Sequence, residues 1–478
     1  MTHTKALSVL DLAFFLLENR ERMSNVGPIV ILKPPPGTRS SKRFADSLLR
    51  RMQKRPVGAP FHYRYHPPGA QGLPRLEVAE NLDPAGHCHR ISLPAPATDA
   101  QLFAHICRIH EKRLDRARPL WEFYVIDGLA HGRIALYAKV HHGIIDGMGF
   151  LEICTRWFTA DAADRKVRAL WEGLPPRSLP DLGKPHPGAA ESLMRKVVAL
   201  GATTASLYTS LAKQAMASAG LANGMPLPFV GTPSALRARP SVRRSFGHCR
   251  LPLAAMKAFG KAHDASVNDM LLTVLDMALN RYLEKKGRGA DQKPLVADMP
   301  VALPSSGQGG NSIAVLQFPL GAAVADPLER LRTICKHTAK VKQHVKAGSA
   351  TALATYTAAV HGIPALFELL NFPDAPMLAN MVISNPTGVK ERRYLAGAEV
   401  EMMLPLSLLA PGQSLNITAV TYGDGLQIAF LGLAAELPDI QLLADFSVDA
   451  FAELTAPVKP IARARPRGTT ASRKAKAT

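Results

Sequence analysis

The sequence predicts an α/β (α+β) protein with more than one sheet, built as two domains on either side of a connector. Strand-like and helix-like apolar patterns alternate along the 478 residues, and a proline-rich stretch interrupts them. Apolar residues make up 47% of the chain and charged residues 20%, which is ordinary for a globular protein. This composition argues against long disordered regions, collagen-like repeats and a coiled-coil rod.

The first half is predicted to place a loop between a strand and a helix. Residues 7–20 have an amphipathic pattern that predicts a short helix. Residues 133–140 are apolar and partly alternating, which predicts a buried strand. Apolar residues then return at helical spacing over residues 148–158. Residues 141–147 therefore lie on a strand-to-helix loop, a common location for functional side chains.

The second half alternates between strands and helices. Its Gly-Asp-Gly turn at residues 423–425 predicts a hairpin between the last two strands. Helices are predicted at residues 255–262, 267–283, 326–346 and 438–454, and strands at residues 294–303, 312–320, 381–384, 415–422 and 426–433.

The connector sets the predicted domain boundaries. Prolines break its first part, and residues 225–240 are again rich in proline. We therefore expect an N-terminal domain at residues 1–160, a connector at residues 161–240, a C-terminal domain at residues 241–456 and a basic, disordered tail at residues 457–478.

The formal net charge of +20 is concentrated in two stretches. Residues 192–263 contain ten basic residues and no acidic one, and residues 459–478 contain seven basic residues and no acidic one. A solvated tail is the plain interpretation, and attraction to an anionic membrane or lipid inclusion is the sharper one. Nucleic acid is not expected as a partner, because the tail has no aromatic residue for base stacking.

The sequence pattern favours a cytoplasmic protein that associates peripherally with a membrane or lipid inclusions. Five widely spaced cysteines without a CxxC pattern argue against a disulfide scaffold and favour a reducing compartment. Asp11 interrupts the apolar N-terminal stretch, which argues against a secretory signal. Residues 347–367 are uncharged, but their polar residues and Pro364 favour a buried helix followed by a loop over a membrane span.

The sharpest motif is His141-His142-Gly143-Ile144-Ile145-Asp146-Gly147, of the form HHxxxDG. A neutral imidazole accepts a hydroxyl proton near neutral pH, so one of these histidines suits the role of a general base. Asp146 would orient a ring or anchor the loop through an arginine that the sequence does not identify. Gly143 and Gly147 would leave room for a substrate beside the backbone. The plain alternative is a pair of loop histidines next to a turn.

Other reaction centres find no support in the sequence. GxSxG, HExxH and GxxxxGK[ST] patterns do not occur. His87-Cys88-His89 lacks partners at zinc-finger spacing, so we expect no metal site.

The HHxxxDG motif resembles the signature of coenzyme-A-dependent acyltransferases, a superfamily that includes chloramphenicol acetyltransferase and the condensation domains of peptide synthetases. Over residues 6–456 the chain is similar to the bacterial wax ester synthase/diacylglycerol acyltransferase family. It departs from the family at residues 384–389, which read SNPTGV instead of the usual SNVPGP, and at Asp127, where glutamate is usual. The similar segments are Pro119-Leu120-Trp121-Glu122, Ile126-Asp127-Gly128-Leu129, Val267-Asn268-Asp269, Gly310-Asn311, Ser384-Asn385, residues 394–398 and residues 412–417.

The resemblance implies two chloramphenicol-acetyltransferase-like subdomains, each a mixed sheet with helices, and an active-site tunnel between them. It implies transfer of a long acyl chain from acyl-coenzyme A, a co-substrate rather than a bound cofactor, to diacylglycerol or a long-chain alcohol. His142 would be the general base, with His141 and Asp146 as supporting residues of the catalytic loop. Asn268 is a candidate donor to the oxyanion, with the cap of a helix as its alternative role. The substrate-binding set would be Gly143, Gly147, Asn268, Asp269, Ser384 and Asn385.

Three alternatives stay open at this point. His141 and Asp146 also match HxxxxD, the pattern of glycerol-phosphate acyltransferases. A condensation-domain enzyme that works on carrier-bound peptides would carry the same HHxxxDG motif. The third alternative is a non-enzymatic basic protein that coats lipid droplets or binds nucleic acid.

Overall fold

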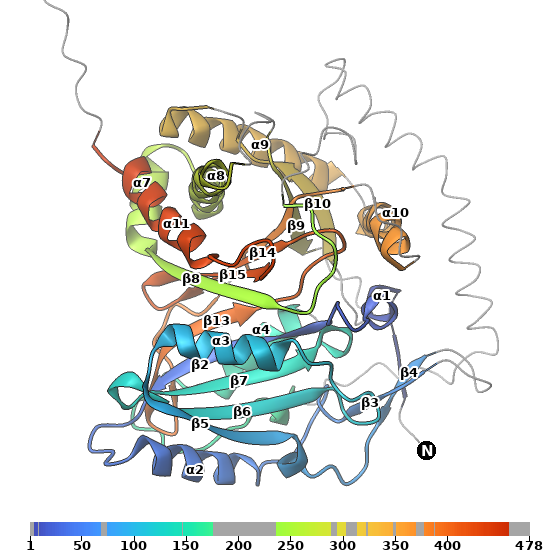
Figure 1. Cartoon of the computed structure of the whole chain (residues 1–478), viewed down its shortest axis with the longest axis vertical. Helices are drawn as coiled ribbons and strands as arrows, with labels where there is room; N and C mark the ends of the chain where they lie inside the picture. The colour runs from blue at the N-terminus through green and yellow to red at the C-terminus, as the bar shows by residue number, and fades with distance from the viewer. Residues whose placement is uncertain are drawn as a thin grey trace, which may run out of the picture.

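Two six-stranded sheets, one from each half of the molecule, lie one above the other in the computed structural model (Figure 1). A third, three-stranded sheet lies beside the first. The structure describes residues 4–7, 9–67, 74–145, 147–174, 236–287, 294–302, 313–321, 324–347, 350–369, 377–386 and 388–457. Most of the expected connector and residues 458–478 of the basic tail fall outside these residues, so the predicted domain boundaries stay predictions.

The first sheet has the strand order β12-β13-β2-β7-β6-β5. Strands β5 and β6 run parallel, and the other neighbours run antiparallel. The turn between β6 and β7 contains His131 and Gly132 with positive φ angles of 60° and 67°, a conformation that glycine adopts without strain. The strands are β2 (Asn25–Lys33), β5 (Cys88–Ala97), β6 (Trp121–Leu129), β7 (Ile134–His141), β12 (Tyr394–Leu395) and β13 (Ala398–Leu406).

Two strands of this sheet come from the C-terminal half of the chain. Strand β13 pairs with β2 along most of its length, and β12 extends the sheet by one more short strand. The sheets therefore do not divide at the same point as the predicted domains, because residues 394–406 belong to the first sheet.

The helices of the first half cover both faces and one end of the sheet (Figure 1). Helix α3 begins with a capping box, in which Thr98 and Gln101 each bind the other's backbone N–H. The remaining elements are the small sheet of β1 (Thr4–Ala6), β3 (Tyr63–His66) and β4 (Arg75–Val78), the helices α1 (Val9–Leu17), α2 (Ser41–Met52), α3 (Asp99–His110) and α4 (Gly147–Trp157), and the 3₁₀ turns η1 (Pro84–His87), η2 (Ala130–Gly132), η3 (His142–Ile144) and η4 (Leu170–Glu172).

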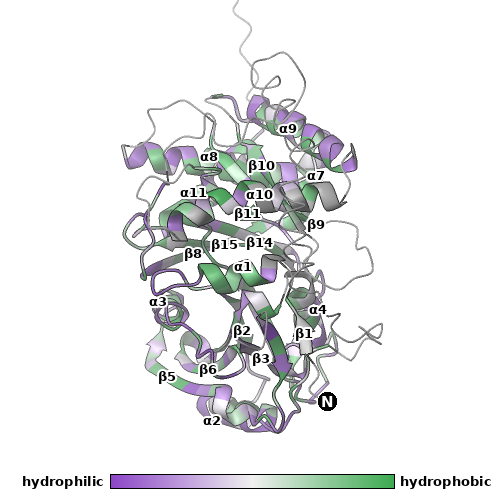
Figure 2. Ribbon diagram, turned by 90° about the vertical axis from the view of Figure 1, so that its right-hand side faces the viewer, coloured by the Kyte–Doolittle hydropathy of each residue, from purple (hydrophilic) through white to green (hydrophobic). Residues whose placement is uncertain are grey.

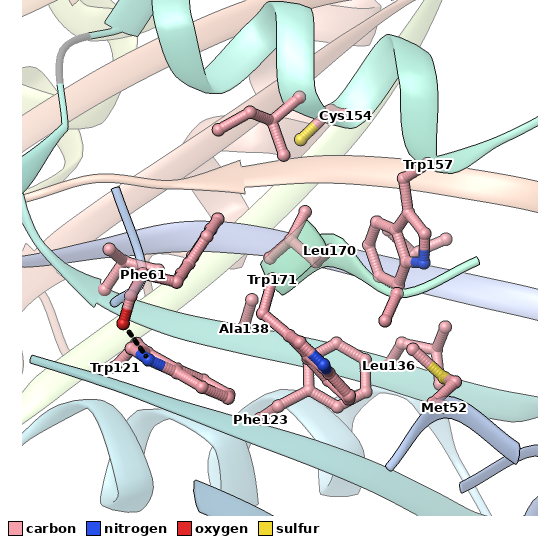
Figure 3. Packing of buried hydrophobic residues seen from close by; sticks show 14 of the residues in the cluster. Met52, Phe61, Trp121, Phe123, Leu136, Ala138, Cys154, Trp157, Leu170 and Trp171 are labelled. Atoms are coloured by element: carbon pink, nitrogen blue, oxygen red, sulfur yellow. Dashed lines mark hydrogen bonds between the residues drawn. The ribbon is translucent and has the colours of Figure 1, made fainter. Parts of the chain in front are cut away.

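All three tryptophans lie in the core of the first half (Figure 3). Trp121 and Trp171 stack with ring centroids 5.3 Å apart, and Trp157 packs edge-on against Phe123. The Trp121 indole N–H donates to the Phe61 carbonyl at 2.8 Å, so its polar atom is satisfied inside the core. This core fixes the start of β6 beside the end of β7.

The second sheet has the strand order β10-β9-β11-β14-β15-β8. Strand β11 runs parallel to both β9 and β14, and the other pairs are antiparallel, so the sheet is mixed as expected. Helices α7, α8, α9 and α11 pack on one side of it (Figure 1). The elements are β8 (Arg244–Pro252), β9 (Val296–Ala302), β10 (Ile313–Pro319), β11 (Met381–Ser384), β14 (Leu415–Tyr422), β15 (Gly425–Leu433), α7 (Leu253–Ala262), α8 (Val267–Lys285), α9 (Pro327–Ala347), α10 (Ala350–Leu369) and α11 (Gln441–Leu454).

The loop expected within residues 347–367 is wrong, because helix α10 continues through Pro364 to Leu369. A proline inside a helix removes one backbone hydrogen bond, but contacts on both sides of it hold α10 in place. Before the proline, Thr357 accepts the N–H of Val315 from the edge strand β10 at 3.0 Å. After it, Glu368 pairs with Arg22. Within the described ranges, no helix combines the length and the apolar character needed to cross a bilayer.

The two halves meet where α3 contacts β8 and β13 contacts β14 and β15, and also at α1 and α10. Figure 2 shows α1, coloured as hydrophobic, at the level where the first sheet ends and the second begins. Helix α1 contacts both the η3 turn of its own half and α10 of the other half.

Candidate active site

The HHxxxDG motif lies at the end of an interior strand of the first sheet, as predicted. Strand β7 is fully buried and ends at His141, the η3 turn follows, and α4 begins at Gly147. The backbone N–H of His141 donates to Leu120, and that of His142 donates to Ser24 at 2.7 Å. Backbone bonds to the residues directly before β6 and β2 thus fix both histidines. Asp146 lies outside the described residues, so its expected arginine partner stays untested.

His141 is completely buried and keeps the loop in shape. The N–H of Gly143 donates to its Nδ1 at 3.0 Å, which places the ring proton on Nε2. That Nε2 faces Oε1 of Glu18 at 3.7 Å, and the ring stacks on Phe15 with centroids 4.3 Å apart. The supporting role expected of His141 stays a prediction.

His142 is partly exposed, and its environment differs from that of its neighbour. Its ring lies against the ring of Phe14, with centroids 4.1 Å apart and planes inclined by 31°. His141 is therefore enclosed by the protein, whereas the residue His142 is partly exposed. A general base needs this second situation, because it must reach a hydroxyl group of the substrate.

Glu18 is a member of the site that the sequence reasoning missed. Its carboxylate is 1% exposed, and Oε2 accepts from Arg113 at 3.2 Å and from Arg116 at 3.0 Å. Oε1 faces His141 and accepts the N–H of Ser24 at 3.3 Å. No motif marks Glu18, since it lies more than a hundred residues before the histidines and its neighbours are apolar or charged in no clear pattern.

The burial of His141 predicts a pH-dependent stability. Burial lowers its pKa to about 3, and the nearby charges of Arg116, His142 and Arg113 add to the effect. An unfolded histidine titrates near pH 6.5, so between these values the unfolded chain takes up a proton that the folded chain does not. Folding stability therefore falls as the pH falls below about 6.5.

We expect the unfolding free energy to lose about 2 kcal/mol through His141 alone between pH 6.5 and pH 5. Urea titrations of the wild type and of His141→Gln at both pH values measure this contribution. The loss of stability should be about 2 kcal/mol smaller in the variant. Equal losses in the two proteins would show that His141 does not titrate as described.

Gly143 leaves no room for a side chain. A Cβ at this position would lie 2.5 Å from Cε2 of Phe15 and 3.0 Å from Nδ1 of His141. We expect Gly143→Ala to destabilise the protein by about 1–3 kcal/mol and to reduce turnover, because either Phe15 or the loop must move. Gly362→Ala on α10 is the matched control, since no atom lies within 4 Å of its added Cβ. Unchanged turnover in Gly143→Ala would contradict the close packing of this loop.

In the second half, the structure brings Asn268 and Asn385 together. Nδ2 of Asn385 donates to Oδ1 of Asn268 at 3.4 Å, and Ser384 directly before it is the last residue of β11. The N-cap of α8 is Ser266, so Asn268 lies in the first turn and is not the cap. The cap alternative for Asn268 is therefore wrong.

Asp269 makes structural contacts. It is 4% exposed, and its carboxylate accepts from the backbone N–H of Ser266 at 2.8 Å and from Thr338 at 2.7 Å. It completes the capping box of α8 and ties α8 to α9. A direct contact between Asp269 and a substrate stays an untested prediction.

Other expected features fall partly outside the described residues. Gly147 is the first residue of α4, whereas Gly310 and Asn311 are not described. The expected tunnel between the halves also stays a prediction, because residues 303–312 and 370–376 are not described. Where the structure describes the chain, no three His, Cys, Asp or Glu side chains gather in a way that could hold a metal ion. All five cysteines are free thiols.

The two stacked mixed sheets with their helices have the fold of condensation domains. The first condensation domain of the calcium-dependent antibiotic synthetase matches 96% of this chain and 98% of its own with a TM-score of 0.54 and 15% identity, a likeness of fold. The wax ester synthase/diacylglycerol acyltransferase of Marinobacter aquaeolei VT8 matches 94% of this chain and 98% of its own, with a TM-score of 0.71 and 26% identity.

Sequence comparison is more specific than the fold. The family model of the wax ester synthase/diacylglycerol acyltransferase catalytic domain matches residues 7–271, and that of the WS/DGAT C-terminal domain matches residues 309–455. A Mycobacterium tuberculosis protein named as a probable diacylglycerol O-acyltransferase, Tgs4, is 31% identical over 94% of this chain and 96% of its own length. The chain belongs to the wax ester synthase/diacylglycerol acyltransferase family, and it is an acyltransferase.

Proposed function

We propose that this acyltransferase moves a long acyl group from acyl-coenzyme A to a lipid alcohol, either diacylglycerol or a long-chain alcohol. The observation that carries the proposal is the partly exposed residue His142 at the end of β7, whose backbone N–H donates to Ser24 and whose ring lies against Phe14. The family models and the name of the mycobacterial relative support the two classes of acceptor.

In the proposed reaction, His142 is the general base. It takes the hydroxyl proton of the acceptor while the hydroxyl oxygen attacks the carbonyl carbon of the thioester. The tetrahedral intermediate then loses the thiolate of coenzyme A, which receives the proton from the imidazolium. One ester and one thiol are formed, and His142 is neutral again without an acyl-enzyme. Proton transfer of this kind contributes about 10²- to 10⁴-fold to the rate.

The oxyanion of the intermediate needs a hydrogen-bond donor, and Asn268 is our candidate. Its Oδ1 accepts from Asn385, which fixes the orientation of the amide group and leaves Nδ2 to serve as the donor. Ser384 and Asn385 would then line the acceptor side of the site from the second sheet. Asp146 would support the histidine loop, as the sequence suggests.

The acceptor class also fits a peripheral association with a lipid surface. Leu16 on α1 is 56% exposed and Ile363 on α10 is 42% exposed, and these two helices are in contact. Exposed leucine and isoleucine side chains near a site for lipid substrates suit contact with a membrane or lipid inclusion. Flotation with anionic vesicles at low salt tests this part, and protein that stays free of the vesicles would contradict it.

Product analysis tests the proposed reaction. Purified protein is incubated with labelled palmitoyl-coenzyme A and, in separate reactions, hexadecanol, diolein or glycerol 3-phosphate, and the lipids are resolved by thin-layer chromatography. We expect a labelled ester with hexadecanol or diolein, and their ratio gives the preferred acceptor. An ester with glycerol 3-phosphate alone, or no ester from folded protein, would contradict the proposal.

A further inference from the structure

We propose that Glu368, on α10 of the second half, is a positioning residue for the catalytic histidine loop of the first half and acts through Arg22. This inference rests on the proposed role of His142. Glu368 and Arg22 are 346 residues apart in the chain, and nothing in the HHxxxDG motif points to either of them.

The contact between the two side chains is buried and bidentate. Nε and Nη2 of Arg22 donate to the two carboxylate oxygens of Glu368, and the side chains are only 10% and 11% exposed. The remaining Nη1 donates to the carbonyl of Leu409 at 2.6 Å. Arg22 is thus bound at two points of the second half by planar, charge-assisted hydrogen bonds, the strongest kind in proteins.

Arg22 belongs to the segment that holds the histidines. Two residues after it, Ser24 accepts the N–H of His142, and its hydroxyl donates to the carbonyl of Phe14 at 2.8 Å. Four residues before it, Glu18 faces the ring of His141. The side chain of Asn19 accepts the N–H of Arg22 at 2.9 Å and so stabilises the turn between Glu18 and Ser24. A shift of Arg22 would therefore move Ser24 and Glu18, which are close to it in the chain. These two residues contact His142 and His141, so both histidines would be displaced.

Helix α10, which carries Glu368, is itself attached to the second sheet by side-chain contacts. Helix α10 is held on the second sheet by Tyr356, whose hydroxyl donates to Gln317 at 2.9 Å, and by His361, whose Nε2 lies 3.3 Å from Oδ1 of Asp298. Tyr356 and His361 both precede Pro364 on α10, and Glu368 lies one turn after it. Helix α10 therefore links the second sheet to the segment that carries Ser24.

Because misplacement of a reacting group by about 1 Å can cost about 10²-fold in rate, a loose Arg22 should lower kcat more than it changes binding. We expect Glu368→Gln to reduce kcat about tenfold or more, with the KM for palmitoyl-coenzyme A changed less than about twofold. Arg22→Gln should have the same effect, and the double variant should be no worse than either single variant, since both remove one interaction.

Asp276→Asn is the matched control. Asp276 and Arg330 form an ion pair of similar burial, 0% and 10% exposed, between α8 and α9, away from the histidine loop. Loss of this ion pair in Asp276→Asn should lower the melting temperature and leave kcat per folded molecule unchanged. If Glu368→Gln fails to fold, Arg22→Lys replaces it, because lysine keeps the charge and loses the bidentate geometry.

A readout without turnover separates this inference from the proposed function. Hydrogen exchange of a peptide that contains residues 141–145 should be faster in Glu368→Gln than in the wild type, and unchanged in Asp276→Asn. Wild-type turnover that depends on His142, together with normal kcat and normal exchange in Glu368→Gln, would overturn the positioning role and leave the proposed function standing. Absence of turnover in the wild type would overturn the proposed function, and the exchange result would still decide whether Glu368 positions the loop.

Discussion

Replacing His142 with alanine is expected to lower kcat by about 10²- to 10⁴-fold, because the hydroxyl group of the acceptor then loses its proton acceptor. The protein should still fold, since His142 is partly exposed and its backbone N–H to Ser24 is kept. Steady-state rates with palmitoyl-coenzyme A and the preferred acceptor measure the effect. The KM for the acyl donor should change little if the imidazole acts mainly in the transition state.

His89→Ala is a suitable control for this experiment. His89 is exposed, stacks on Tyr124 and lies on the edge strand β5, which β6 separates from β7. Its replacement should leave kcat within about twofold of the wild type. A folded His142→Ala protein with wild-type kcat would contradict the role of His142 as base.

The second large effect is expected at Glu18. Glu18→Ala removes a buried carboxylate that pairs with Arg113 and Arg116 and accepts the N–H of Ser24, and it takes away the negative charge that faces Nε2 of His141. We expect a loss of about 3 kcal/mol in unfolding free energy, at the lower end for a broken buried pair because both arginines are partly exposed. Turnover should also fall, because His141 and Ser24 both depend on this carboxylate.

Urea unfolding and kcat, measured on the same preparations, test the Glu18 prediction. Glu18→Gln should lose less stability than the alanine variant, because its side-chain oxygen can still accept one of these bonds. Glu152→Ala on α4 is the control, since its pair with Arg156 is largely exposed and should contribute less than about 1 kcal/mol. A Glu18→Ala protein as stable as this control would show that the network at His141 is unimportant.

The sequence predicted local elements well where a period or a turn signal was strong. Strands β11 and β14 begin and end at the predicted residues, and the hairpin at residues 423–425 connects β14 to β15. Helix α8 was predicted from its apolar spacing and ends two residues later than expected. Such features depend on neighbours a few residues apart, which the sequence displays directly.

Features that depend on distant partners were not predicted. Strand β13 joins the first sheet although it lies between β11 and β14 of the second sheet along the chain, because its pairing with β2 is decided by the three-dimensional fold. Helix α10 passes through Pro364 because Arg22 and Val315, far away in the chain, hold its two parts. Periodicity in one segment contains no information about such partners.

In the candidate site, too, local features were predicted from the sequence and distant partners were not. The location of His141 and His142 at a strand end was confirmed, since a buried strand followed by a helix can be identified from local pattern. The family and its acyltransferase activity were confirmed by the family models and the relatives. Glu18 and Arg22 were missed, because only the folded chain brings them to the loop.

Release of coenzyme A in the presence and absence of acceptor tests the central claim most directly. Wild-type protein at concentrations near that of palmitoyl-coenzyme A is mixed with donor alone or with donor and acceptor, and free thiol and protein-bound label are followed together. Direct transfer with His142 as base predicts that thiol appears only with the acceptor, that no label stays on the protein, and that His142→Ala releases almost none. A burst of one thiol per protein without acceptor, with the acyl label bound to the chain, would contradict it.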